Sequence, residues 1–175
     1  PKNQFFGVCD ATDPSYDPGF PCNDKLIGAW GYPDVNSGDP TDSNGHGSHT
    51  ASTAAGNVVN DAQIVAPTTT LTRDISGVAP HANLISYKAC TDTAEGDSTC
   101  AEGALIQALD QAALDGVDVV NFSIGGGARD PWEGVRAGSN RADDMAEAFL
   151  NLREAGVVPV VSAGNDGPYA ATVSS

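Results

Sequence analysis

Apolar residues follow two different periods in the second half of the chain. Short apolar runs predict strands over residues 84–89, 117–124 and 157–162, and apolar residues recur at helical spacing over 101–115 and 143–154. The valine-rich runs of the last two strands predict that both are buried. Strands that alternate with helices through short connections are typical of an α/β fold, a parallel sheet with helices on both faces.

The first half of the chain is less regular. Residues 1–25 and 31–44 are rich in turn formers and predict loops on either side of a strand over 25–30. Small side chains dominate residues 45–56, which predict a helix that must pack closely against its neighbour. Residues 57–76 are rich in Thr and Asp, and we expect a polar connector there.

The charge balance narrows the possible partners. The chain of 175 residues, about one domain, has 23 acidic and 8 basic side chains and a formal charge of −15 at pH 7. This balance argues against a nucleic acid or an anionic membrane surface as partner, since both attract clustered Lys and Arg. No apolar stretch approaches the length of a membrane span, about 18 residues. The chain begins at Pro1 without a signal-peptide pattern, so we expect a processed product or an excised piece.

The four cysteines, Cys9, Cys22, Cys90 and Cys100, form no C-x-x-C pair, which makes a zinc or thioredoxin-type site a poor interpretation. Local bridges Cys9–Cys22 and Cys90–Cys100 are favoured among the three pairings, because each pair brackets a segment rich in turn residues. Four buried free thiols are the alternative. Bridges would indicate an oxidising compartment, and hence a secreted protein.

Two histidines lie where a Gly-rich loop enters the predicted helix. Flanking glycines would let other chains approach the ring of His46 closely. His49, three residues on, falls near the same helix face, so a metal site with Asp42 as third ligand is conceivable. No H-E-x-x-H or similar ligand set supports it, and we expect no metal. His81 lies in a predicted turn and is expected to be a surface residue.

Polar and glycine-rich segments follow two of the predicted strands, at residues 123–127 and 162–167. In parallel sheets, functional residues gather at the carboxyl ends of strands. The Asn165 amide could donate a hydrogen bond to a developing oxyanion, or Asn165 could simply occupy a left-handed turn. The glycines after Ser123 match no phosphate-loop pattern. They could leave a backbone edge open to an extended peptide, or form an ordinary turn.

These segments together resemble a known family. Residues 45–57 (GHGSHTASTAAGN), 77–89 (GVAPHANLISYKA), 115–126 (DGVDVVNFSIGG) and 162–168 (SAGNDGP) are similar to motifs of the subtilisin-like serine proteases, in the family's order. Residues 22–29, with the helix motif, resemble the plant-type subgroup and its bacterial relatives. Members of that subgroup usually carry an inserted protease-associated domain, and they often pair cysteines locally in the two regions where this chain has them.

The resemblance implies a role for individual residues. His46 would be the catalytic base and acid, and Asn165 would donate its amide to the tetrahedral oxyanion. One wall of the substrate cleft would be formed by Ser123, Ile124, Gly125 and Gly126, and the opposite wall by Ala163 and Gly164. By weaker alignment, Asp97 and Ser98 would lie near the far edge of the bound substrate. The resemblance implies a structural role for His49.

The family's triad also needs an Asp in an Asp-Thr/Ser-Gly setting and a Ser in Gly-Thr-Ser-Met-Ala, and neither is present. We therefore expect residues 1–175 to be the central part of a subtilisin-like catalytic domain, with an incomplete sheet. The rest of that domain would be its partner and polypeptides its substrates, and the piece alone would be inactive.

A peptide-binding pseudoenzyme of the same fold is the alternative to an active protease. Asp166 follows the oxyanion Asn, and we expect it to favour cationic side chains mildly in the primary pocket. No cofactor is predicted. A structural calcium ion is not predicted, because a polar surface would equally explain the candidate ligands, which are Asn57, Asn60, Asp61 and Asp74.

Overall fold

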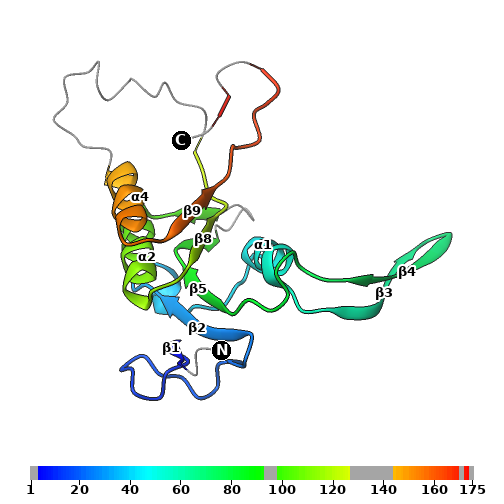
Figure 1. Ribbon diagram of the computed structural model, residues 1–175, viewed down its shortest axis with the longest axis horizontal. Helices are drawn as coiled ribbons and strands as arrows, with labels where there is room; N and C mark the ends of the chain where they lie inside the picture. The colour runs from blue at the N-terminus through cyan, green and yellow to red at the C-terminus, as the bar shows by residue number, and fades with distance from the viewer. Residues whose placement is uncertain (1–3, 93–97, 127–143, 170–171, 174–175) are drawn as a thin grey trace. The chain divides into compact units, whose positions relative to one another are not determined.

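The computed structural model describes residues 4–92, 98–126, 144–169 and 172–173. The chain divides into two compact units, Pro1–Ala101 and Glu102–Ser175 (Figure 1). Each unit contains helix and a set of parallel strands, which confirms the predicted α/β class. None of the helices in these ranges is long and apolar enough to cross a membrane.

A parallel three-stranded sheet organises the first unit. It consists of β1 (Phe6–Gly7), β2 (Leu26–Gly31) and β5 (Leu84–Lys88), with β2 in the middle. The two longer strands confirm the predictions over 25–30 and 84–89. Strand β1 was not predicted, because its two residues lie in a segment dominated by turn formers.

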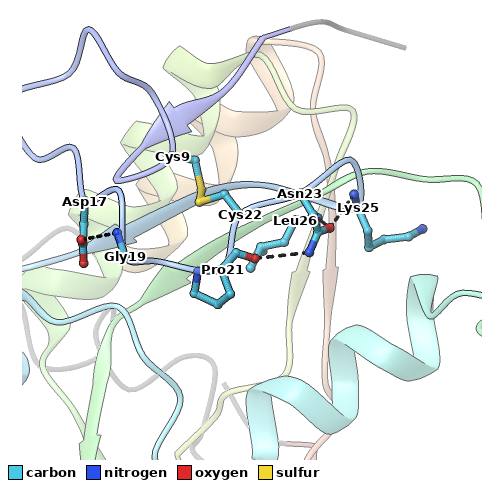
Figure 2. Close-up of a disulfide and its surroundings, with 8 residues drawn as sticks. All are labelled: Cys9, Asp17, Gly19, Pro21, Cys22, Asn23, Lys25 and Leu26. Atoms are coloured by element: carbon cyan, nitrogen blue, oxygen red, sulfur yellow. Dashed lines mark hydrogen bonds between the residues drawn. A yellow bond between two sulfur atoms is a disulfide. The ribbon is translucent and has the colours of Figure 1, made fainter.

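The core of this unit gathers around the middle of β2. Ala29 is fully buried there, and the buried Val8 and Cys9 pack against it together with the partly buried Phe20 and Cys22. A disulfide joins Cys9 to Cys22 with their Cα atoms 5.7 Å apart (Figure 2). The bridge therefore closes the loop between β1 and β2, as predicted.

A second bridge closes a small hairpin of two strands, β6 (Cys90–Asp92) and β7 (Ser98–Cys100). Cys90 lies directly opposite Cys100 in this antiparallel pair, and the two are bonded. All four cysteines are among the described residues and all are bonded, so the free-thiol alternative is wrong.

The predicted polar connector over 57–76 is exposed, but it contains two strands that the sequence analysis did not predict. These residues form an antiparallel hairpin of β3 (Val59–Ala66) and β4 (Thr69–Ile75), which extends away from the rest of its unit (Figure 1). Val, Ile and Thr suit a pleated strand, and this preference outweighs the polar composition. Ile64 lies opposite Leu71, and both side chains are exposed.

The second unit contains two helices and two strands. In chain order these are α2 (Glu102–Asp115), β8 (Val119–Phe122), α4 (Asp144–Glu154) and β9 (Val158–Val161), close to the predicted ranges. The two helices pack against each other, and α4 also contacts β9. The ring of Phe122 in β8 meets the ring of Phe149 in α4 edge to face, with centroids 5.1 Å apart.

The predicted burial of these two strands is only partly right. They pair in parallel, yet Val119, Val158 and Val161 are each 56% exposed among the described residues. Inward-facing apolar residues come mainly from the helices, with Leu109 and Leu152 almost fully buried. A valine-rich run predicts a strand correctly, but it does not report what covers each face.

Candidate active site

Helix α1 (His46–Ala55) presents the candidate catalytic histidine as its first residue. Gly45 caps the helix with φ at 91°, a left-handed conformation that favours glycine. This confirms the predicted helix over 45–56. Of the residues in α1 only Ala55 is buried, so the close packing expected of its small side chains is restricted to its C-terminal end.

The C-terminal end of α1 is held by the segment after the hairpin. Amides of Val78 and Ala79 donate hydrogen bonds of 3.1 and 2.8 Å to the carbonyls of Thr53 and Ala54. Gly77 lies so close that a Cβ there would be 2.3 Å from the Gly56 nitrogen. Only glycine fits at this position, and the contact fixes the far end of the helix that carries His46.

The N-terminal end of α1 is held by one carboxylate. Oδ1 of Asp42 accepts hydrogen bonds from the amides of Asn44 and Gly45, at 3.0 and 2.9 Å. Oδ2 accepts from the amide and the hydroxyl of Ser48, at 2.9 and 2.6 Å. Both carboxylate oxygens are thus engaged with the residues that flank His46.

These contacts also set the charge of Asp42. Desolvation by itself raises the pKa of the carboxyl, but the hydrogen bonds from Ser48, Gly45 and Asn44 favour the ionised form more strongly. The net result is a pKa for Asp42 well below its ordinary value. The helix start therefore carries a permanent negative charge at neutral pH, as the helix dipole favours.

These four hydrogen bonds give the Asp42 carboxylate a structural use that involves no metal. The side chains of His46 and His49 are exposed, and the His49 carbonyl accepts bonds from Ser52 and Thr53 inside the helix. Within the described ranges, no group of three or more His, Cys, Asp or Glu side chains is gathered as a metal site requires. The sequence analysis missed this role of Asp42, because its spacing from His46 and Ser48 does not by itself distinguish a helix cap from a metal ligand.

The two strand ends proposed as cleft walls lie side by side. Phe122 pairs with Val161, so segments 123–126 and 163–165 leave the same edge of the β8–β9 pair. Beyond the ladder, the Ser162 amide donates to the Phe122 carbonyl at 3.1 Å and its hydroxyl to the Ile124 carbonyl at 3.5 Å. The structure thus brings together the segments that contain the predicted wall residues, which are Ser123, Ile124, Gly125, Gly126, Ala163 and Gly164.

A left-handed residue directly precedes Asn165. Gly164 has φ at 81°, and Asn165, whose side chain is exposed, begins a short bend. The left-handed conformation expected for Asn165 as the simpler alternative therefore falls on Gly164. The Asn165 amide is left at the end of a strand, exposed to solvent, as is Asp166.

Other predicted positions are separate from these segments. His46 belongs to the first unit and Asn165 to the second. Asp97 lies outside the described residues, and Ser98 begins β7. In the hairpin, the Asp61 amide donates to Oδ1 of Asp74 at 2.8 Å, which gives that carboxylate a structural use. His81 is exposed in a turn, as predicted.

Comparison with known proteins decides the family. A model of the subtilase family matches residues 15–175. The chain belongs to the subtilase family. Its relatives include the subtilisin-like proteases SBT4.12 and SBT2.1 of Arabidopsis thaliana. The first is 37% identical over 174 residues, 99% of this chain and 20% of the relative. The second is 38% identical over 185 residues, 98% of this chain and 20% of the relative.

The matches cover nearly all of this subtilase chain but only a small part of each relative. SBT4.9 of the same plant is 34% identical over 100% of this chain and 21% of its own length. The chain thus spans about a fifth of the length of the curated relatives it matches. The printed names of these relatives describe proteases, in agreement with the resemblance drawn from the four motifs.

Proposed function

We propose that this subtilase chain supplies the general base, an oxyanion-hole donor and part of the substrate cleft of a secreted serine endopeptidase. The observation that carries the proposal is the position of its two key side chains. His46 opens a helix whose start is held in place, and Asn165 follows a parallel strand at the edge where segment 123–126 also emerges. Both are positions from which a side chain can reach a bound peptide.

The chemistry would be acyl transfer. A serine hydroxyl from a segment outside these residues attacks the peptide carbonyl while His46 takes its proton, and the C–N bond then breaks as His46 returns that proton to the leaving amine. The Asn165 amide donates a hydrogen bond to the oxyanion of the tetrahedral intermediate. Water then attacks the acyl-enzyme carbonyl while His46 takes its proton, and His46 returns that proton to the serine oxygen as the acyl product leaves.

The strand ends would bind the substrate. Gly125 and Gly126 are exposed beyond β8 and have no side chain to obstruct an added strand, so an extended polypeptide could pair with this backbone. Ser123 and Ile124 would complete that wall of the primary pocket, and Ala163 and Gly164 would form the other. Asp166 at the rim would favour cationic side chains mildly, and Ser98 would lie along the far edge of the substrate.

In our proposal, the remaining catalytic groups come from outside these residues. The 175 residues are the central part of a catalytic domain, and the orienting Asp and nucleophilic Ser come from segments outside them, so the piece alone is inactive. Two disulfides and a net charge of −15 suit an extracellular protein.

A fluorophosphonate probe tests the proposal on the complete polypeptide that contains this sequence. The probe labels only a serine activated by a positioned base. We expect labelling of the folded protein and none after His46→Ala, with His49→Ala as a matched control that still labels. Absence of labelling in the folded, mature protein would favour the peptide-binding pseudoenzyme, in which His46 has no catalytic use.

A further inference from the structure

The cap residue of helix α1 provides no side-chain hydrogen bond to the start of the helix. The first amides of a helix have no partner within it, and a side chain at the cap position usually satisfies one of them. Here that position is Gly45, which has no side chain. The Asp42 carboxylate takes over the task from outside the helix by accepting the Ser48 amide at 2.9 Å.

The same carboxylate fixes the residues on the other side of the histidine. Its Oδ1 accepts the amides of Asn44 and Gly45, while Oδ2 accepts both donors of Ser48. His46 lies between the two groups of donors. The backbone on both sides of His46 is therefore attached to one rigid, planar group, and the left-handed turn at Gly45 is held with it.

The chemistry of this group suits a fixed anchor. Its hydrogen bonds are charge-assisted, which makes them stronger than bonds between neutral groups. The pKa of Asp42 lies well below its ordinary value because these donors outweigh desolvation, so the carboxylate stays ionised wherever a histidine base operates. Neither oxygen is left to act on a substrate as a proton acceptor, so Asp42 acts through the loop.

We propose that Asp42 is a positioning residue for His46, acting by clamping the backbone on both sides of it. This inference rests on the proposed protease function and adds a residue to it. A general base must lie within hydrogen-bond reach of the proton it removes, and a small displacement there slows the chemical step. Substrate affinity should change little, because segments 123–126 and 163–165 are elsewhere in the chain.

Steady-state kinetics of the complete polypeptide tests the clamp. We expect Asp42→Asn to lower kcat and the rate of fluorophosphonate labelling together, by about 10- to 100-fold, with KM within about twofold of wild type. Asp39→Asn is the matched control. Asp39 accepts an amide from Thr41 in a similar turn nearby, so this variant removes the same charge without touching the clamp, and its kcat should stay within about twofold.

A pair of nearly isosteric variants at Ser48 covers the case in which Asp42→Asn fails to fold. Ser48→Thr keeps the hydroxyl that donates to Oδ2, whereas Ser48→Val loses it. Both are β-branched in a helix, so their helix propensities are comparable. We expect kcat near wild type for Ser48→Thr and about 3- to 10-fold lower for Ser48→Val, with both variants fully folded at the assay temperature in thermal unfolding.

Two results would overturn the clamp while leaving the protease proposal intact. One is a wild-type kcat in both Asp42→Asn and Ser48→Val. The other is a rise in KM, or a fall in thermal midpoint that accounts for the whole loss of activity. A wild-type protein that the probe does not label would instead overturn both proposals together.

Discussion

The two sides of the proposed site are held in place by different means. On the His46 side, one carboxylate organises residues 42–48 through hydrogen bonds within that short segment. On the Asn165 side, position depends on the ladder between β8 and β9, whose partners lie 38 or more residues apart, as in the bond from Ser162 to Ile124. The first arrangement is local, and the second depends on the fold.

Because of this difference, a single substitution can disturb the His46 side, whereas the Asn165 side is disturbed when the fold is loosened. A local clamp needs only its own side chains to form. A ladder between distant strands needs the packing around it, and Val119 and Val158 on that ladder are each 56% exposed among the described residues. We therefore expect point substitutions to act sharply near His46, and changes in packing to act first near Asn165.

Replacement of His46 is the strongest test of the local side. His46→Ala removes the group that moves the proton, and we expect kcat of the complete protein to fall by about 10⁴-fold or more. His49→Ala in the same helix should cost no more than about tenfold, since that side chain touches no reacting atom in our proposal. Active-site titration checks that the same amount of folded protein is compared. Equal losses in the two variants would contradict the assignment of the base.

Replacement of Asn165 tests the side that depends on the fold. Asn165→Ala should lower kcat by about 10² to 10³, a range measured on a related subtilisin rather than derived from this chain, with KM little changed. Asp166→Asn is the neighbouring control and should leave kcat nearly unchanged with a neutral substrate. A loss confined to KM in Asn165→Ala would place Asn165 in substrate binding instead of oxyanion stabilisation.

The sequence predicts this fold best where one face of an element is buried. Helix α2 has its apolar residues at helical spacing, and Leu105 and Leu109 are buried as that spacing requires. The hairpin of β3 and β4 has no such face, and its exposed Ile64 and Leu71 give no periodic signal that separates it from a loop. The predicted burial of β8 and β9 is only partly right, because a valine run does not show what covers a strand.

The sequence singles out candidate residues for the site but not the contacts that hold them in place. His46 and Asn165 stand out through their glycine neighbours and the motifs around them. The clamp by Asp42 was missed because an Asp four residues before a histidine is compatible with a metal ligand, a turn or a cap. Only the positions of its two oxygens, one toward Gly45 and one toward Ser48, decide between them.

Removal of a disulfide destabilises the fold without changing a residue on either side of the proposed site. A double Cys9→Ser, Cys22→Ser variant should lower the free energy of unfolding by about 2–4 kcal/mol, since it frees the loop that packs on Ala29. The equivalent change at Cys90–Cys100 should cost less, because it opens a hairpin in which Ser98 and Thr99 are exposed, not a loop packed on buried residues. Urea unfolding of the complete protein measures both. A larger loss for the Cys90–Cys100 variant would show that this bridge contributes more to stability than its position in the hairpin indicates.

The pH dependence of stability offers the finest test of the local clamp. The pKa of Asp42 is lowered in the folded state, so its contribution is fully present above the ordinary pKa of an Asp, about 4, and is lost as pH falls through the lower folded value. At pH 6, Asp42→Asn should be less stable than wild type by about 0.5–2 kcal/mol, the range for a lost helix cap. The gap should narrow steadily below pH 4 in urea unfolding curves. A gap that is unchanged at low pH would show that the charge of Asp42 does not hold the helix start.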